Sequence, residues 1–172
     1  MKIYINYTTL LPHLQVFYTK RLDKTQKIVH NYSNILTKER AEKMQIDLGG
    51  NLLPGFVGGS KNNEICAERL RTLYSAGVDA AVLTPRYYPA KMTVREFSDL
   101  RQRMLFGLDK HMPKKCPALY LGSEVYLDER LKYISDIGDL AIVGTRTLIV
   151  DMPAGAWESA LLDTLYATLW SK

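Results

Sequence analysis

The sequence predicts an α/β fold in which parallel strands alternate with helices. From about residue 45 onward, short apolar runs alternate with longer segments in which apolar residues recur at helical spacing. Residues 79–84 form a short, continuous and mainly apolar run, which is typical of a parallel strand buried on both faces. Strands that alternate with helices at this spacing indicate right-handed βαβ units and therefore a parallel sheet.

Four apolar runs are expected to form the strands, and the segments that follow them are expected to form helices. The strands are expected at residues 44–48, 79–84, 118–122 and 147–151, and the helices at 62–76, 93–110, 127–133 and 154–170. Gly77 is expected to end the first helix. Thr93 and Glu96 form a capping-box pattern at the start of the second. The last helix has an apolar stripe formed by Leu161, Leu162, Leu165 and Leu169.

Length and composition are those of an ordinary globular protein. The 172 residues suit one domain, and the 47% hydrophobic content is enough for a core. No apolar run approaches the roughly 18–20 residues that a membrane span needs, and residues 1–7 lack a signal-peptide pattern. Cys66 and Cys116 lack the spacing of a metal motif. We therefore expect a cytoplasmic protein with free thiols and no membrane span.

The net charge of +5 lies entirely before Ile46, where eight basic residues outnumber three acidic ones. Residues 1–44 are expected to form a basic, mainly helical extension that begins as a short strand or coil, and residues 45–172 the main domain. The basic residues are spread among apolar ones, which favours a solvated helical face. Contact with nucleic acid or with an anionic membrane surface stays open as an alternative.

The carboxyl ends of the four expected strands carry the candidate binding groups, because ligands collect at that edge of a parallel sheet. Four motifs stand there in order. Residues 46–59 are Ile-Asp-Leu-Gly-Gly-Asn-Leu-Leu-Pro-Gly-Phe-Val-Gly-Gly, residues 83–89 are Leu-Thr-Pro-Arg-Tyr-Tyr-Pro, residues 122–127 are Gly-Ser-Glu-Val-Tyr-Leu, and residues 144–153 are Gly-Thr-Arg-Thr-Leu-Ile-Val-Asp-Met-Pro. In order and spacing they are similar to motifs of the bacterial PHP-type tyrosine-protein phosphatases of capsule and exopolysaccharide synthesis.

The resemblance covers about residues 45–172 and implies a partial PHP-like (β/α) barrel. In that family a manganese-type metal cluster lies at the carboxyl ends of the strands. The enzymes hydrolyse phosphotyrosine on the tyrosine kinases that control capsule assembly. Histidines and carboxylates hold such hard ions, which activate an attacking water. The resemblance implies that this chain is a shortened member that has lost most of these ligands.

Carried over residue by residue, most ligand positions of the family hold residues that cannot bind a metal. The two histidines of the opening motif fall on Gly49 and Asn51, and the histidine after Thr-Pro falls on Arg86. An acidic ligand falls on Val57 or Gly58. The opening motif therefore keeps the pattern of a metal site while lacking its donor groups.

Two carboxylates remain at strand ends: Glu124, the one ligand position that keeps its residue, and Asp151, which matches a family acid. We expect Glu124 to pair with Arg86, while a role of Arg86 in binding a phosphate or carboxylate stays open. One carboxylate without imidazole partners cannot hold a catalytic metal cluster. Neither a metal nor another cofactor is therefore expected.

These observations favour a non-catalytic relative of the phosphatases that acts by binding a protein. The partner is either another protein, including a phosphorylated or acidic one, or a second copy of the chain. Half of a barrel exposes a sheet edge, so we expect the N-terminal extension to cover it or the chain to dimerise. Two alternatives stay open: a weak phosphoesterase completed by another chain, and a basic-arm module for nucleic acid or membrane surfaces, of which nucleic acid is not the expected partner.

Overall fold

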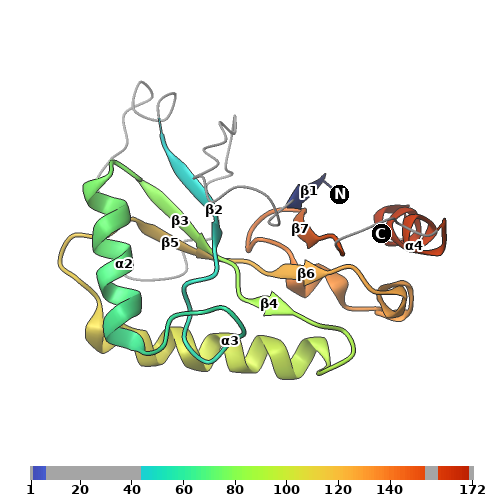
Figure 1. Ribbon diagram of the computed structural model, residues 1–172, viewed down its shortest axis with the longest axis horizontal. Coiled ribbons are helices and arrows are strands. Elements are labelled where there is room, and N and C mark those ends of the chain that lie inside the picture. The colour runs from blue at the N-terminus through green and yellow to red at the C-terminus, as the bar shows by residue number, and fades with distance from the viewer. Residues whose placement is uncertain (1, 7–43, 154–158, 171–172) are drawn as a thin grey trace.

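The computed structural model describes residues 2–6, 44–153 and 159–170, and it has the expected α/β architecture (Figure 1). The helical extension expected within residues 7–43 lies outside the described residues, as does the expected first turn of the last helix at 154–158. No helix in the described part is long and apolar enough to cross a membrane.

Every strand pair among the described residues is parallel, as the sequence predicts. One sheet has the order β1-β7-β6-β4 and the other the order β2-β3-β5. The strands are β1 (Lys2–Asn6), β2 (Ile46–Gly50), β3 (Ala80–Leu83), β4 (Arg86–Tyr87), β5 (Ala118–Leu121), β6 (Glu124–Tyr126) and β7 (Thr147–Asp151).

The two sheets continue into one another, because β3 leads directly into β4 and β5 directly into β6. Gly122 N donates to Leu83 O at 3.0 Å and Glu124 N donates to Pro85 O at 3.1 Å, so the pairing runs on across both junctions. β2 and β1 therefore lie at the two outer edges, and neither sheet closes on itself in the described part. β1 is part of the expected N-terminal extension and pairs with β7 along its whole length. Residues 2–6 of the extension therefore cover the edge that β7 would otherwise expose.

The helices are α2 (Asn63–Ser75), α3 (Val94–Leu108) and α4 (Ser159–Trp170), with short 3-10 helices η1 (Asp109–His111), η2 (Glu129–Tyr133) and η3 (Ile137–Leu140). The expected capping box at α3 is confirmed: Glu96 N donates to Thr93 Oγ1, and Thr93 N donates to Glu96 Oε2. Gly77, just beyond α2, has a φ of 89°, which favours glycine. In Figure 1, α2 and α4 lie at opposite ends of the molecule.

Three expectations for the elements need correction. The helix expected at 127–133 is the 3-10 helix η2, and β4 and β6 were not expected as separate strands. In α4, Leu161 and Leu165 pack against the core, whereas Leu162 is 36% exposed. Leu162 is turned by about 100° from Leu161 around the helix, which carries its side chain away from the core. The side chain of Leu169 lies outside those described.

The core has three parts that together fix the strand ends. One lies between the two sheets and includes Val82 of β3 and Ile149 of β7. A second packs α2 and α3 against β3 and β5, and a third packs α3 and α4 against β4, β6 and β7. Because helices and both sheets share these clusters, the positions of the strand ends are determined by packing on either side.

Candidate functional site

Three charged side chains from three neighbouring strands meet: Arg86 of β4, Glu124 of β6 and Asp151 of β7. The register of β4 and β6 sets Arg86 directly beside Glu124. Arg86 Nε donates to Glu124 Oε2 at 2.8 Å and lies 3.8 Å from Asp151 Oδ2. The expected pair of Arg86 and Glu124 is therefore confirmed, and Asp151 joins it as a second, more distant carboxylate. We call these three residues the ion cluster.

The ion cluster is mostly shielded from water, which strengthens its charges' mutual influence. The side chains of Arg86, Glu124 and Asp151 are 29%, 6% and 12% exposed. The hydrogen bond to Glu124 raises the pKa of the Arg86 guanidinium above its usual value. Burial, followed by the negative charge of Glu124, raises the pKa of the Asp151 carboxyl, although Arg86 opposes this shift. With both carboxylates ionised, the cluster carries one net negative charge.

Aromatic side chains border the ion cluster. After the larger effects of Glu124 and Asp151, the nearby Tyr88 side chain also raises the pKa of the Arg86 guanidinium. The rings of Tyr88 and Tyr126 lie 5.4 Å apart between centroids, and Lys91 Nζ lies 4.7 Å from the centroid of the Tyr88 ring. Tyr87, which lies between Arg86 and Tyr88 in the sequence, is buried and packs edge-on against Phe97 of α3. The border of the cluster is thus held by packing rather than left open to rearrange.

The glycine-rich segment after β2 forms a defined loop. Asn51 Nδ2 donates to Val57 O at 2.8 Å, which ties the two sides of the loop together. Gly58 has a φ of 78°, a conformation that favours glycine. The Val57 side chain is 54% exposed. Asn51, Val57 and Gly58, where the resemblance would place metal ligands, therefore lie close together. What joins them is a hydrogen bond between an amide and a carbonyl rather than a shared metal ion.

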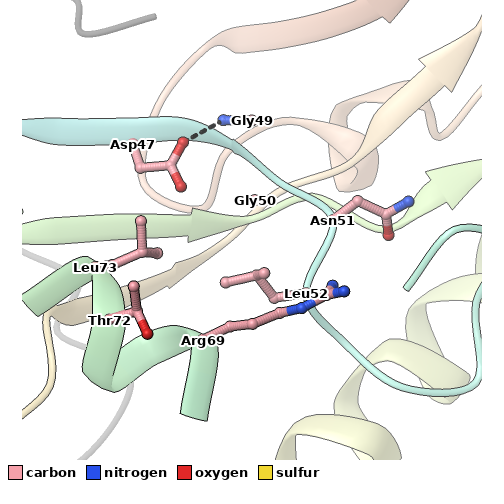
Figure 2. Close-up of a pocket in the computed structure, with 8 residues that line it drawn as sticks. All are labelled: Asp47, Gly49, Gly50, Asn51, Leu52, Arg69, Thr72 and Leu73. Atoms are coloured by element: carbon pink, nitrogen blue, oxygen red, sulfur yellow. Dashed lines mark hydrogen bonds between the residues drawn. The ribbon is translucent and has the colours of Figure 1, made fainter. Parts of the chain in front are cut away.

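Gly49 and Asn51 belong to a groove separate from the ion cluster (Figure 2). Its lining comes from β2, the following loop and α2: Asp47, Gly49, Gly50, Asn51, Leu52, Arg69, Thr72 and Leu73. No residue of the ion cluster contributes to this lining. The positions that the resemblance assigns to one metal site are therefore divided between two places on this chain.

The donor groups present do not suit a manganese-type centre. Within the described residues, no three His, Cys, Asp or Glu side chains lie close enough together to hold a metal ion. Arg86, at the position where the resemblance would place a histidine ligand, is a permanent cation bound to Glu124. Asn51 directs its amide nitrogen at Val57 O. No catalytic step through a metal follows from this arrangement.

Sequence reasoning missed Arg101, a buried arginine of α3 that supports the turn before Glu124. Its Nη1 donates to Gly122 O at 2.8 Å and to Ser123 Oγ at 2.9 Å, and its Nη2 donates to Asp139 O at 3.1 Å. The residue is only 4% exposed, and burial lowers the pKa of its guanidinium. Arg101 therefore positions the junction of β5 and β6, from which Glu124 projects.

Gly122 completes this junction by its lack of a side chain. A Cβ at this position would lie 3.1 Å from Val82 Cγ1 and 3.2 Å from Ile142 Cγ1. The close packing brings the turn against β3 and fixes the start of β6.

Comparison with protein-family models, with curated proteins and with solved structures finds no match for this chain. The chemistry and geometry of its own residues therefore carry the functional argument.

Proposed function

We propose that this chain is a non-catalytic relative of the PHP-type tyrosine phosphatases of capsule and exopolysaccharide synthesis, and that it acts by binding a protein partner. One observation carries the proposal: Arg86 Nε lies 2.8 Å from Glu124 Oε2 and 3.8 Å from Asp151 Oδ2. A guanidinium thereby compensates the two carboxylates where the family resemblance would have a metal ion do so.

This arrangement argues against metal-dependent hydrolysis by the chain alone. A metal ion at these carboxylates would have to approach the positive charge of Arg86, whose raised pKa keeps it protonated. Loss of a single ligand already weakens metal binding strongly, and Gly49, Asn51 and Arg86 replace three histidines of the family pattern. Without the ions, the metal-bound hydroxide that this class of hydrolysis uses is not formed.

The ion cluster also argues against Arg86 as an anion site. Its Nε is already bound to Glu124, and Asp151 lies nearby. An incoming phosphate would have to displace a carboxylate from Arg86 and would be repelled by the net negative charge of the ion cluster. Protein binding remains as the function that these residues support best, and the unpaired outer edge of β2 among the described strands offers a surface for it.

Metal content and turnover test the proposal directly. The purified full chain is incubated with manganese, desalted and analysed for bound metal, and its hydrolysis of a phosphotyrosine peptide is then measured. We expect less than one manganese per chain and no turnover above a buffer control. One or more bound ions, together with turnover that Glu124→Gln abolishes, would show that the chain is a phosphatase and overturn the proposal.

A further inference from the structure

The groove between β2 and α2 has a volume of about 420 Å³, which is within the usual range of binding sites. Figure 2 shows Asp47 entering it from β2 and Arg69 reaching along it from α2 toward Leu52. The two opposite charges thus line the same groove from different elements. Thr72 and Leu73 of α2 form the wall beside them.

The open edge of β2 forms one border of this groove. In the described part of the chain, β2 is hydrogen-bonded only to β3, with Ile46 opposite Ala80 and Asp47 opposite Ala81. Alternate peptide groups of an edge strand face away from its partner and can accept a further strand. An extended peptide can therefore add to β2 while its side chains enter the groove.

Glycine keeps the groove open. A Cβ on Gly49 would meet only Asp47 Oδ1, at 3.9 Å, so a side chain here would project into free space. Gly49 is exposed, but its own N–H and C=O are bonded to Asp47 Oδ1 and Asn51 N, so it offers space rather than backbone partners. Gly50, in contrast, is needed for the fold, because a Cβ there would lie 2.9 Å from Val82 O.

The charged side chain of Arg69 is available for a ligand. It is exposed, and it makes no hydrogen bond or ion pair within the described residues. The guanidinium can therefore receive a carboxylate in bidentate geometry. Asp47 Oδ1 accepts a hydrogen bond from Gly49 N at 3.1 Å, which holds its carboxylate at the groove.

We infer that this groove binds an extended segment of the partner protein that pairs with the edge of β2 and presents an acidic and a basic side chain on one face. In a strand, residues two positions apart share a face, so the acidic side chain meets Arg69 while the basic one meets Asp47. The inference rests on the proposed function, because it specifies the chemistry of the partner.

The test uses the ¹⁵N-labelled full chain and a capped peptide, Val-Lys-Val-Glu-Val, followed by NMR. We expect saturable shifts of the amides of Ile46–Gly50 and binding that weakens at least about tenfold in Arg69→Glu. Arg71→Glu, a matched exposed arginine of α2 outside the groove, should change the affinity less than about twofold. The Arg69→Glu variant should in turn bind Val-Lys-Val-Lys-Val better than the unmodified chain does, since the new charges are complementary.

A steric pair of variants gives an independent test. Gly49→Val should fill the groove and abolish peptide binding without unfolding the chain, whereas Gly138→Val, at a position with open space around it, should leave binding unchanged. The inference is wrong if millimolar peptide shifts no β2 amide, if both arginine variants lose equal affinity, or if free glutamate or Val-Gln-Val-Gln-Val binds as well. These outcomes leave metal content and turnover untouched, so failure here is distinguishable from failure of the proposed function.

Discussion

Replacing Arg101 by methionine is expected to destabilise the protein through the turn that carries Glu124. Arg101 donates three hydrogen bonds, to Gly122 O, Ser123 Oγ and Asp139 O, from a side chain that is almost completely buried. Hydrogen bonds from a charged group contribute about 1.5–3 kcal/mol each. Their sum overstates the loss, because the variant no longer buries a guanidinium, at a cost of several kcal/mol. We expect the free energy of unfolding to fall by about 3 kcal/mol, because three acceptors lose their donor at roughly 1–3 kcal/mol for each buried group, partly offset by this gain.

Urea unfolding followed by circular dichroism measures this loss. In a chain of this length, about 3 kcal/mol corresponds to a fall in Tm of roughly 6–12 °C. Arg103→Met is the matched control, since Arg103 lies on the same helix but is exposed, and it should change stability by less than about 0.5 kcal/mol. Equal losses in the two variants, or a loss below about 1 kcal/mol for Arg101→Met, would refute the role assigned to Arg101.

Three further predictions follow from the charges, the caps and the thiols. Because the Asp151 pKa is raised, the folded carboxyl keeps its proton to higher pH than the unfolded one, and stability is lost as pH rises through the folded pKa. Asp151→Asn lacks this loss, so its free energy of unfolding in urea titrations should rise relative to that of the unmodified chain between acid and neutral pH. A difference that stays constant with pH would contradict this. Thr93→Ala removes the cap of α3 and should lower the free energy of unfolding by about 1 kcal/mol near neutral pH in urea titrations. The cap also lowers the Glu96 pKa, so part of this loss should disappear as pH falls through the folded pKa of Glu96. A loss that does not depend on pH would exclude the coupling. Burial raises the pKa of Cys66 to about 11, so a thiol reagent at pH 8 should modify it only in denaturant; rapid modification of the native chain, located by mass spectrometry, would show that the site is open.

Local patterns were sufficient to predict most of the fold. The apolar run at 79–84 became β3, all four residues of which are buried. The capping box at Thr93 and the glycine after α2 marked helix ends because capping depends on neighbours within four residues. Elements whose formation depends on residues close in sequence were thus accessible without a structure.

The elements that the sequence did not reveal depend on distant partners. β4 is only Arg86–Tyr87, and its strand geometry follows from pairing with β6, 38 residues later. Arg101 stands among charged and polar neighbours in α3, so a solvent-exposed position was the natural expectation. It is buried instead because Gly122, Ser123 and Asp139 bring acceptors to it from elsewhere in the chain.

The candidate site likewise has one part that the sequence predicts and another that depends on contacts between distant residues. The pair of Arg86 and Glu124 was predictable, since neighbouring strand ends place an arginine beside a carboxylate. The separation of Gly49 and Asn51 from this pair was not, because it depends on the course of the loop after β2. The bond from Asn51 to Val57 folds that loop onto itself, and the exposed Gly49 instead becomes part of the groove against α2.

On the proposed function, this site stays ordered without a metal ion because two arginines hold its groups in place. Arg86 compensates the carboxylates of Glu124 and Asp151, which would otherwise repel each other at adjacent strand ends. Arg101 fixes the turn from which Glu124 projects. An ordered surface loses less conformational freedom when a partner binds, which raises affinity. On the proposed function, Arg86 therefore has two effects: it opposes a metal ion at these carboxylates, and together with Arg101 it holds this part of the sheet in one arrangement.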